Sequence, residues 1–169
     1  IQDGWGKYLY LRDDDTGDIW SASWKPVCAS FERYEVRHGI GYTTFVQDHG
    51  GIETRWTLCV PPDEPCEIWR VQLRNTGSTP RRLSLFSYLE WSLGNDLDWH
   101  REFQKTFIET TFIEGLRALV GVKRKLPIPP YISTGFTEWP LSGFHAVNRP
   151  VSSYEGDKEA FLGRYHTLQ

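Results

Sequence analysis

The stretch IETRWTLCV, residues 52–60, decides the fold class of this chain. Its residues alternate between two sides: Ile52, Thr54, Trp56, Leu58 and Val60 fall on one, and Glu53, Arg55 and Thr57 on the other. Alternation with a period of two is typical of a β-strand that buries one face. The pattern therefore predicts a strand here, with the tryptophan side turned toward a core.

Comparable segments precede and follow this strand, and turn signals separate them. We expect strands in residues 7–13, 19–23, 34–48, 67–75, 81–93, 117–125, 143–148 and 159–165. The prolines of PPDEP, residues 61–65, end the 52–60 strand, so that strand should lie beside 67–75. In 81–93, Leu85 faces one side and Phe86 and Tyr88 the other, which predicts burial of both faces. Without a helical apolar stripe, the chain is predicted to be all-β, a single antiparallel β-sandwich domain spanning residues 1–169.

Composition narrows the classes of function. A net charge of −3 over 169 residues gives no electrostatic attraction to nucleic acid or to an anionic membrane. No run of eighteen apolar residues occurs and the first residues lack a basic and an apolar region, so we expect neither a transmembrane span nor a signal peptide. Three cysteines without metal-like spacing favour a reduced, cytoplasmic setting. The chain has no Met, at its start or elsewhere, and we expect it to be a piece of a larger protein.

The acidic run DDDTGD, residues 13–18, invites comparison with a calcium loop. A helix-loop-helix site requires a bidentate Glu at its twelfth position, which is Trp24 here, and the flanking segments are strands. We therefore interpret the run as a hairpin turn. The five histidines lack metal-ligand spacing, and phosphate-loop, dinucleotide and nucleophile-elbow motifs are absent. No metal site, cofactor or catalytic residue is predicted from the motifs.

The segment YEVRHGIGYTTF, residues 34–45, places Arg37 and His38 beside Gly39 and Gly41 in a strand-like run. Glycine weakens a strand interior, so it marks a bend or the close approach of a backbone or ligand. Both possibilities remain open from the residues alone.

Eight tryptophans suggest carbohydrate, because aromatic faces pack against the C–H faces of sugar rings. Trp56, Trp69 and Trp91 alternate with aliphatic residues in strands, where core packing explains them. Trp99 lies outside any alternating run and has cationic neighbours in His100, Arg101 and Lys105. This irregular segment is the better binding candidate, and a solvated loop is the alternative.

Four segments resemble a known family: YLYLRDDDTGDIWSASWKPV (8–27), YEVRHGIGYTTF (34–45), the stretch from Gly51 to Trp91, and WHREFQKTFIET (99–110). They are similar to the N-terminal domain of inverting β-glycoside phosphorylases, glycoside hydrolase family 94, formerly glycosyltransferase family 36. The resemblance is dense from about residue 5 to residue 115. It implies a β-supersandwich like that of galactose mutarotase, followed in the parent enzyme by an (α/α)6 barrel. Neither the barrel nor the family's first strands are expected within this chain.

The resemblance also implies a function. The parent would cleave β-linked di- or oligosaccharides with inorganic phosphate as co-substrate, and the barrel would supply the catalytic acid. This domain would be non-catalytic and without a cofactor. Arg37 and His38 would anchor the sandwich to neighbouring segments, while Trp99, His100, Arg101, Gln104 and Lys105 would bind carbohydrate at the acceptor side. Lys105 stands where arginine is common in the cellobiose branch, so the sugar specificity does not carry over.

Two functions are therefore weighed. One is the domain of a glycosyl-transferring phosphorylase, packed against its own barrel in a cytoplasmic homodimer. The alternative is a stand-alone carbohydrate-binding module. A downstream barrel in the parent gene favours the first, and oligosaccharide binding by the isolated chain favours the second.

Overall fold

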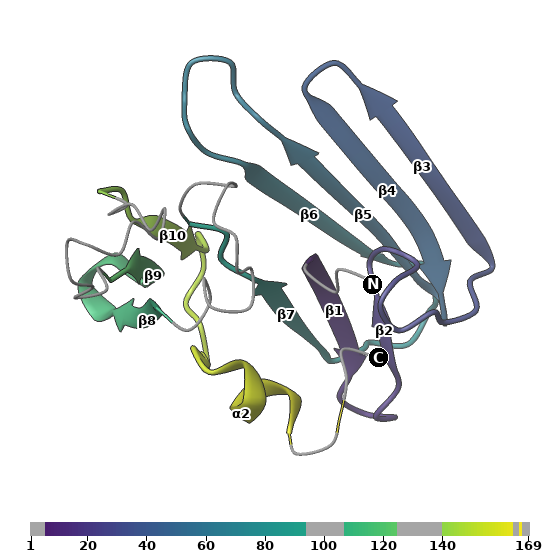
Figure 1. Ribbon diagram of the computed structural model, residues 1–169. Helices are drawn as coiled ribbons and strands as arrows, with labels where there is room; N and C mark the ends of the chain where they lie inside the picture. The colour runs from purple at the N-terminus through teal and green to yellow at the C-terminus, as the bar shows by residue number, and fades with distance from the viewer. Residues whose placement is uncertain (1–5, 94–106, 125–139, 164–165, 167–169) are drawn as a thin grey trace, which may run out of the picture. The chain divides into compact units, whose positions relative to one another are not determined.

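A computed structural model describes residues 6–93, 107–124, 140–163 and 166 (Figure 1). The chain divides into two compact units, one formed mainly by residues 1–89 and the other by Glu90–Thr167. In the described part of both units, all paired strands run antiparallel.

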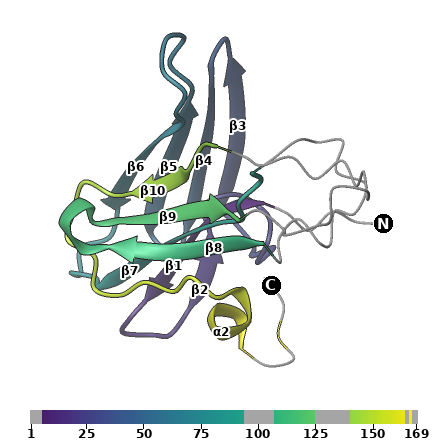
Figure 2. The ribbon, with the colours of Figure 1, turned by 60° about the vertical axis from the view of Figure 1, so that its left-hand side comes forward.

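The first unit contains two sheets. One has the order β2-β1-β7, and the other is a meander in the order β3-β4-β5-β6 whose strands lie side by side in Figures 1 and 2. The strands are β1 (Lys7–Asp13), β2 (Ile19–Ser21), β3 (Arg33–Gly39), β4 (Tyr42–His49), β5 (Ile52–Cys59), β6 (Ile68–Asn75) and β7 (Leu83–Leu89). The expected pairing of 52–60 with 67–75 is confirmed, since Trp56 in β5 lies opposite Val71 in β6.

The core of this unit lies between the two sheets. Leu9, Leu11 and Trp20 come from β1 and β2, and Ile52 and Trp56 come from β5. All five side chains are buried, and Trp56 packs edge-on against Trp69 at 5.2 Å between ring centroids. Because buried aromatic rings remove large apolar areas from water, these tryptophans contribute strongly to the hydrophobic stabilisation. The sandwich predicted from the alternation is confirmed.

The glycines of the 34–45 segment form a turn rather than a bulge. Strands β3 and β4 are joined through Ile40 and Gly41, and Gly41 has φ of +78°. That backbone conformation strongly favours glycine. A Cβ at Gly39 would overlap the ring of Tyr42, which lies directly opposite in the hairpin. Both glycines are therefore explained by this hairpin.

The DDDTGD segment is a hairpin turn, as expected. One carboxylate oxygen of Asp13 accepts hydrogen bonds from the backbone N–H groups of Asp15 and Thr16, at 2.8 and 3.2 Å. Gly17 has φ of +80°, and the chain returns into β2 antiparallel to β1. The Asp13 side chain thus organises the turn by local hydrogen bonding, which is typical of aspartate in this position.

The second unit is a three-stranded sheet with one short helix. The sheet has the order β10-β9-β8, with β8 (Ile108–Ile113), β9 (Ala118–Lys123) and β10 (Gly143–Ala146), and its three strands run side by side in Figure 2. A 3-10 turn, η1 (Glu114–Leu116), connects β8 to β9. Strands β9 and β10 confirm the predictions for 117–125 and 143–148.

Three expectations were wrong. The single strand expected over residues 34–48 is instead the β3–β4 hairpin, because the chain reverses at Ile40 and Gly41. The segment predicted as a strand at 159–165 contains the helix α2 (Lys158–Leu162) instead. Asp157 caps this helix by accepting from the N–H groups of Glu159 and Ala160, and local capping of this kind outweighs a weak apolar pattern. Strand β7 is not buried on both faces, because Leu85 is 46% exposed while Tyr88 is buried.

Candidate functional site

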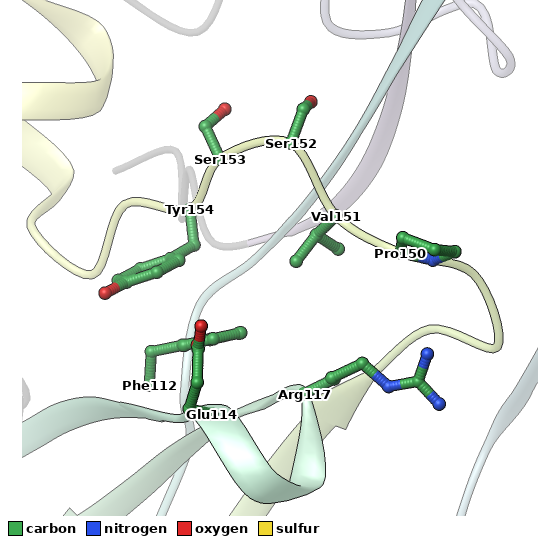
Figure 3. A pocket seen from close by; sticks show the side chains of 8 residues that line it. All are labelled: Phe112, Glu114, Arg117, Pro150, Val151, Ser152, Ser153 and Tyr154. Carbon is green, nitrogen blue, oxygen red and sulfur yellow. The ribbon is translucent and has the colours of Figure 1, made fainter.

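An open cavity of about 360 Å³ lies within the second unit, between the β8–β9 connection and the segment 150–154 (Figure 3). Its volume is at the small end of the range for small-molecule sites. The lining residues come from two stretches far apart in the sequence: Phe112, Glu114, Arg117, Pro150, Val151, Ser152, Ser153 and Tyr154.

The η1 turn positions the charged residues of this pocket. Arg117 ends the turn in the left-handed conformation, with φ of 50° and ψ of 45°, and its N–H donates to the Glu114 carbonyl at 3.1 Å. A non-glycine residue in this region costs about 1–2 kcal/mol. The tight reversal leads from β8 into β9 and leaves the Glu114 and Arg117 side chains at the edge of the cavity (Figure 3).

An aromatic pair forms one side of the pocket. The rings of Phe112 and Tyr154 are stacked, with centroids 4.0 Å apart and an interplanar angle of 12°. Tyr154 is 58% exposed, whereas Phe112 is half-buried. In Figure 3, Val151 points into the space beside these rings, and the hydroxyls of Ser152 and Ser153 point away from it. The cavity therefore has an apolar wall next to an accessible aromatic ring.

Two charged groups complete the lining. Glu114 and Arg117 are both exposed, and within the described part of the chain neither side chain forms an ion pair or a hydrogen bond. A carboxylate offers only acceptors and a guanidinium only donors. Together they can serve a ligand that both donates and accepts hydrogen bonds.

The surrounding structure holds the two sides of the pocket in place. The Trp91 indole lies against Gly121 of β9 and Gly143 of β10, where an added Cβ would come within 2.7 and 2.8 Å of the ring. Trp91 also donates to the Thr110 hydroxyl in β8 at 3.0 Å. Lys158, at the start of α2, donates to the Glu90 carboxylate at 2.7 Å. These contacts position β8 and the segment before α2, which carry Phe112 and Tyr154.

Carbohydrate binding was predicted for five residues of the segment 99–105. Trp99, His100, Arg101, Gln104 and Lys105 all lie outside the described residues. Their role stays a prediction.

Arg37 and His38 lie exposed on the β3–β4 hairpin. Arg37 donates from Nε to Glu35 at 2.5 Å, and the His38 ring hydrogen-bonds the Thr43 hydroxyl at 3.0 Å. The hydrogen bonds from Arg37 and Arg33 hold the pKa of the Glu35 carboxyl below its usual range. Both contacts are local to the hairpin, and the predicted anchoring of neighbouring segments remains a prediction for the parent protein.

The pocket itself was missed from the sequence. Glu114 and Arg117 lie on either side of Gly115 and Leu116, and a glycine in this place signals a turn but not a ligand site. Tyr154 is separated from them by more than thirty positions, and no periodic pattern connects the two stretches.

Two further observations concern the described residues only. No three His, Cys, Asp or Glu side chains are grouped there in a way that could hold a metal ion. The helices of that part are also too short or too polar to cross a membrane.

Comparison with known proteins identifies the domain. Residues 1–169 match the family model described as glycosyl hydrolase 94, supersandwich domain. The chain is 37% identical over 168 residues to N,N'-diacetylchitobiose phosphorylase of Vibrio furnissii, covering 97% of this chain and 20% of that protein. It is 30% identical over 162 residues to solabiose phosphorylase of Paenibacillus borealis, covering 96% of this chain and 20% of that protein.

A third relative is a synthase. The chain is 31% identical over 171 residues to the cyclic beta-(1,2)-glucan synthase NdvB of Rhizobium meliloti, covering 99% of this chain and 6% of that protein. The chain thus spans about one fifth or less of the length of these curated relatives. The full-length match and these identities show that the chain belongs to the supersandwich domain family of glycosyl hydrolase 94.

Proposed function

We propose that this chain is the non-catalytic, carbohydrate-contacting domain of an inverting β-glycoside phosphorylase that acts on β-linked di- or oligosaccharides. The observation that carries the proposal is the alignment of nearly the whole chain with one fifth of two proteins named phosphorylases. The remaining length of such a protein can hold the catalytic machinery, which we assign to an (α/α)6 barrel.

Three described carboxyl groups have surroundings that do not suit a general acid. Inverting transfer to phosphate requires a general acid that is protonated near neutral pH, and enzymes achieve this by raising the pKa of a carboxyl group. The pKa of Asp13, Asp14 and Glu35 is shifted downward instead, because Arg81, Ser84 and Arg37, respectively, hydrogen-bond their carboxylates.

The contact with substrate is assigned to the segment around Trp99. Trp99 offers an aromatic face, and His100, Arg101, Gln104 and Lys105 offer donors for sugar hydroxyls. In this proposal the segment forms one edge of the acceptor subsite. The parent is expected to be a cytoplasmic homodimer, with no metal or organic cofactor and with phosphate as co-substrate.

The test compares the full-length parent with the isolated chain. Each is incubated with β-linked disaccharides of glucose or N-acetylglucosamine and inorganic phosphate, and sugar 1-phosphate is measured. The proposal expects phosphate-dependent product from the parent and none from the isolated chain. Absence of phosphorolysis by the folded parent on every β-linked disaccharide tested contradicts the enzyme class. Product formed by the isolated chain contradicts the non-catalytic role.

A further inference from the structure

We propose that the pocket between the η1 turn and segment 150–154 binds one neutral pyranose ring of an oligosaccharide. The site lies entirely among described residues of the second unit. It is separate in sequence from the Trp99 segment, so the inference goes beyond the proposed function and requires no catalytic step.

The apolar wall suits the C–H face of a sugar. Tyr154 is 58% exposed although it is a large aromatic residue, and it is stacked on Phe112 at 4.0 Å. Stacking holds the Tyr154 ring in one orientation, so little side-chain entropy is lost when a ligand packs beside it. Pro150 and Val151 extend the apolar lining on the other side of the cavity (Figure 3).

The charged lining suits hydroxyl groups. A sugar ring carries several hydroxyls that both donate and accept, so one hydroxyl can donate to the Glu114 carboxylate and a different one can accept from the Arg117 guanidinium. Because neither group forms an ion pair in the described part of the chain, no internal salt bridge has to be broken on binding.

The balance of charge favours a neutral ligand. Glu114 and Arg117 contribute one negative and one positive charge at the same cavity. A phosphate or a sugar acid would be attracted by Arg117 but repelled by Glu114. A cationic amino sugar would be attracted by Glu114 but repelled by Arg117. A neutral ring experiences neither repulsion and can still form charge-assisted hydrogen bonds.

The size of the cavity limits the ligand. The cavity volume of about 360 Å³ lies at the small end of the range for ligand pockets. A cavity of this size accommodates one sugar ring, and the rest of an oligosaccharide would stay in solvent. A ligand of this size in an open site is expected to bind with a dissociation constant on the order of 1 mM.

The experiment uses the full-length protein and two probes, cellotetraose and its N-acetylglucosamine counterpart, without phosphate so that neither is consumed. Crystals are soaked with each probe, and binding stoichiometry is measured by calorimetric titration. The expected result is ring density against Tyr154 and between Glu114 and Arg117, with a weak binding event in solution. Substitution R117M or E114Q should weaken that event by about tenfold or more, because each removes a charge-assisted hydrogen bond.

The matched control is R149M, which removes an exposed arginine that does not line the cavity and should leave the binding event unchanged. Because Glu114 and Arg117 are exposed, their variants should keep the circular dichroism spectrum of the wild type. An empty pocket in soaked crystals, or equal titrations of wild type, R117M and E114Q, overturns the inference. Phosphorolysis by the same protein is assayed separately, so failure of the pocket and failure of the proposed enzyme class give different results.

Discussion

Arg81 binds the fully buried carboxylate of Asp13, donating from Nε to Oδ2 at 2.7 Å. Asp13 is the last residue of β1, in the three-stranded sheet of the first unit. The same guanidinium donates from Nη1 to the Gly50 carbonyl at 2.9 Å, in the turn between β4 and β5 of the other sheet. One arginine therefore connects the two sheets of the sandwich, through the end of β1 and the turn between β4 and β5.

Removing this arginine should destabilise the domain. In Arg81→Met the buried Asp13 carboxylate loses its cationic partner, and an uncompensated buried charge is strongly unfavourable. We expect the melting temperature of the chain to fall by about 10 °C or more. Differential scanning calorimetry measures the change.

Arg82→Met is the matched control. Arg82 also pairs with an aspartate, Asp15, but its side chain is 75% exposed. Surface pairs contribute little, so its melting temperature should change by no more than about 2 °C. Similar melting temperatures for the two variants contradict the importance assigned to the buried pair.

The same pair should give the domain an acid-sensitive component of stability. The hydrogen bonds from Arg81, and then from the Asp15 N–H, hold the pKa of Asp13 below its usual range. A carboxyl group with a lowered folded-state pKa contributes stability above its unfolded value, and this is lost as the pH falls through the folded value. Asp13→Asn should therefore flatten the decline in melting temperature on the acid side. Part of the decline should remain, because the pKa values of Asp14 and Glu35 are also lowered. Parallel acid-side curves for wild type and variant rule out this contribution.

Three neighbouring tyrosines, Tyr8, Tyr10 and Tyr88, predict that the domain also loses stability at alkaline pH. Burial, with Tyr10 and Tyr8 nearby, raises the pKa of Tyr88 to about 12. A group whose pKa is higher in the folded protein than in the unfolded chain makes stability depend on pH. Its contribution to stability is fully present below the pKa of the unfolded chain, about 10 for tyrosine, and is lost as the pH rises through the pKa of the folded protein. Stability should therefore fall between about pH 10 and 12, and Tyr88→Phe should reduce this slope. Urea midpoints at several pH values measure it, with Tyr42→Phe on the exposed hairpin as control. An unchanged slope in Tyr88→Phe contradicts the assignment.

The hairpin glycine offers a test of backbone conformation. Gly41 has φ of +78°, so Gly41→Ala places a Cβ in a strained conformation and should cost about 1 kcal/mol or more. Gly115→Ala is the control, because an added Cβ there meets nothing within 4 Å and the φ is not positive. Urea denaturation of both variants gives the free energies of unfolding. Equal stability of the two variants means that the turn relaxes without strain.

The sequence predicted the first unit better than the second, for physical reasons. In the 52–60 segment apolar and polar residues alternate because one face of the strand packs on Leu9, Leu11 and Trp20. Burial of that face is therefore visible in the sequence pattern. The pairings of β1 with β2 and of β5 with β6 were predicted from the turns between them, where Gly and Pro leave the backbone few conformations.

Helix α2 was missed because five residues are too few for a helical period, and the Asp157 cap outweighed the local pattern. The pocket was missed for a different reason. It is assembled from Phe112, Glu114 and Arg117 on one stretch and Tyr154 on another, and only the tertiary fold brings them together. The family resemblance identified the domain but carried no information about this cavity.

The last prediction concerns the segment around Trp99 in the full-length parent. Trp99 and Lys105 are proposed to contact the acceptor sugar, one through its aromatic face and the other through a charge-assisted hydrogen bond. Trp99→Ala and Lys105→Ala should each raise KM for the acceptor more than KM for phosphate, with an effect of about 1.5–3 kcal/mol, or roughly ten- to a hundredfold. Steady-state kinetics in the synthetic direction give KM for the acceptor, kinetics in the phosphorolytic direction give KM for phosphate, and melting temperatures show whether each variant is folded. If Trp99 only packs within the domain, Trp99→Ala will lower the melting temperature and leave the acceptor KM of the folded enzyme unchanged. Wild-type acceptor kinetics in both variants would show that this segment does not form the acceptor subsite.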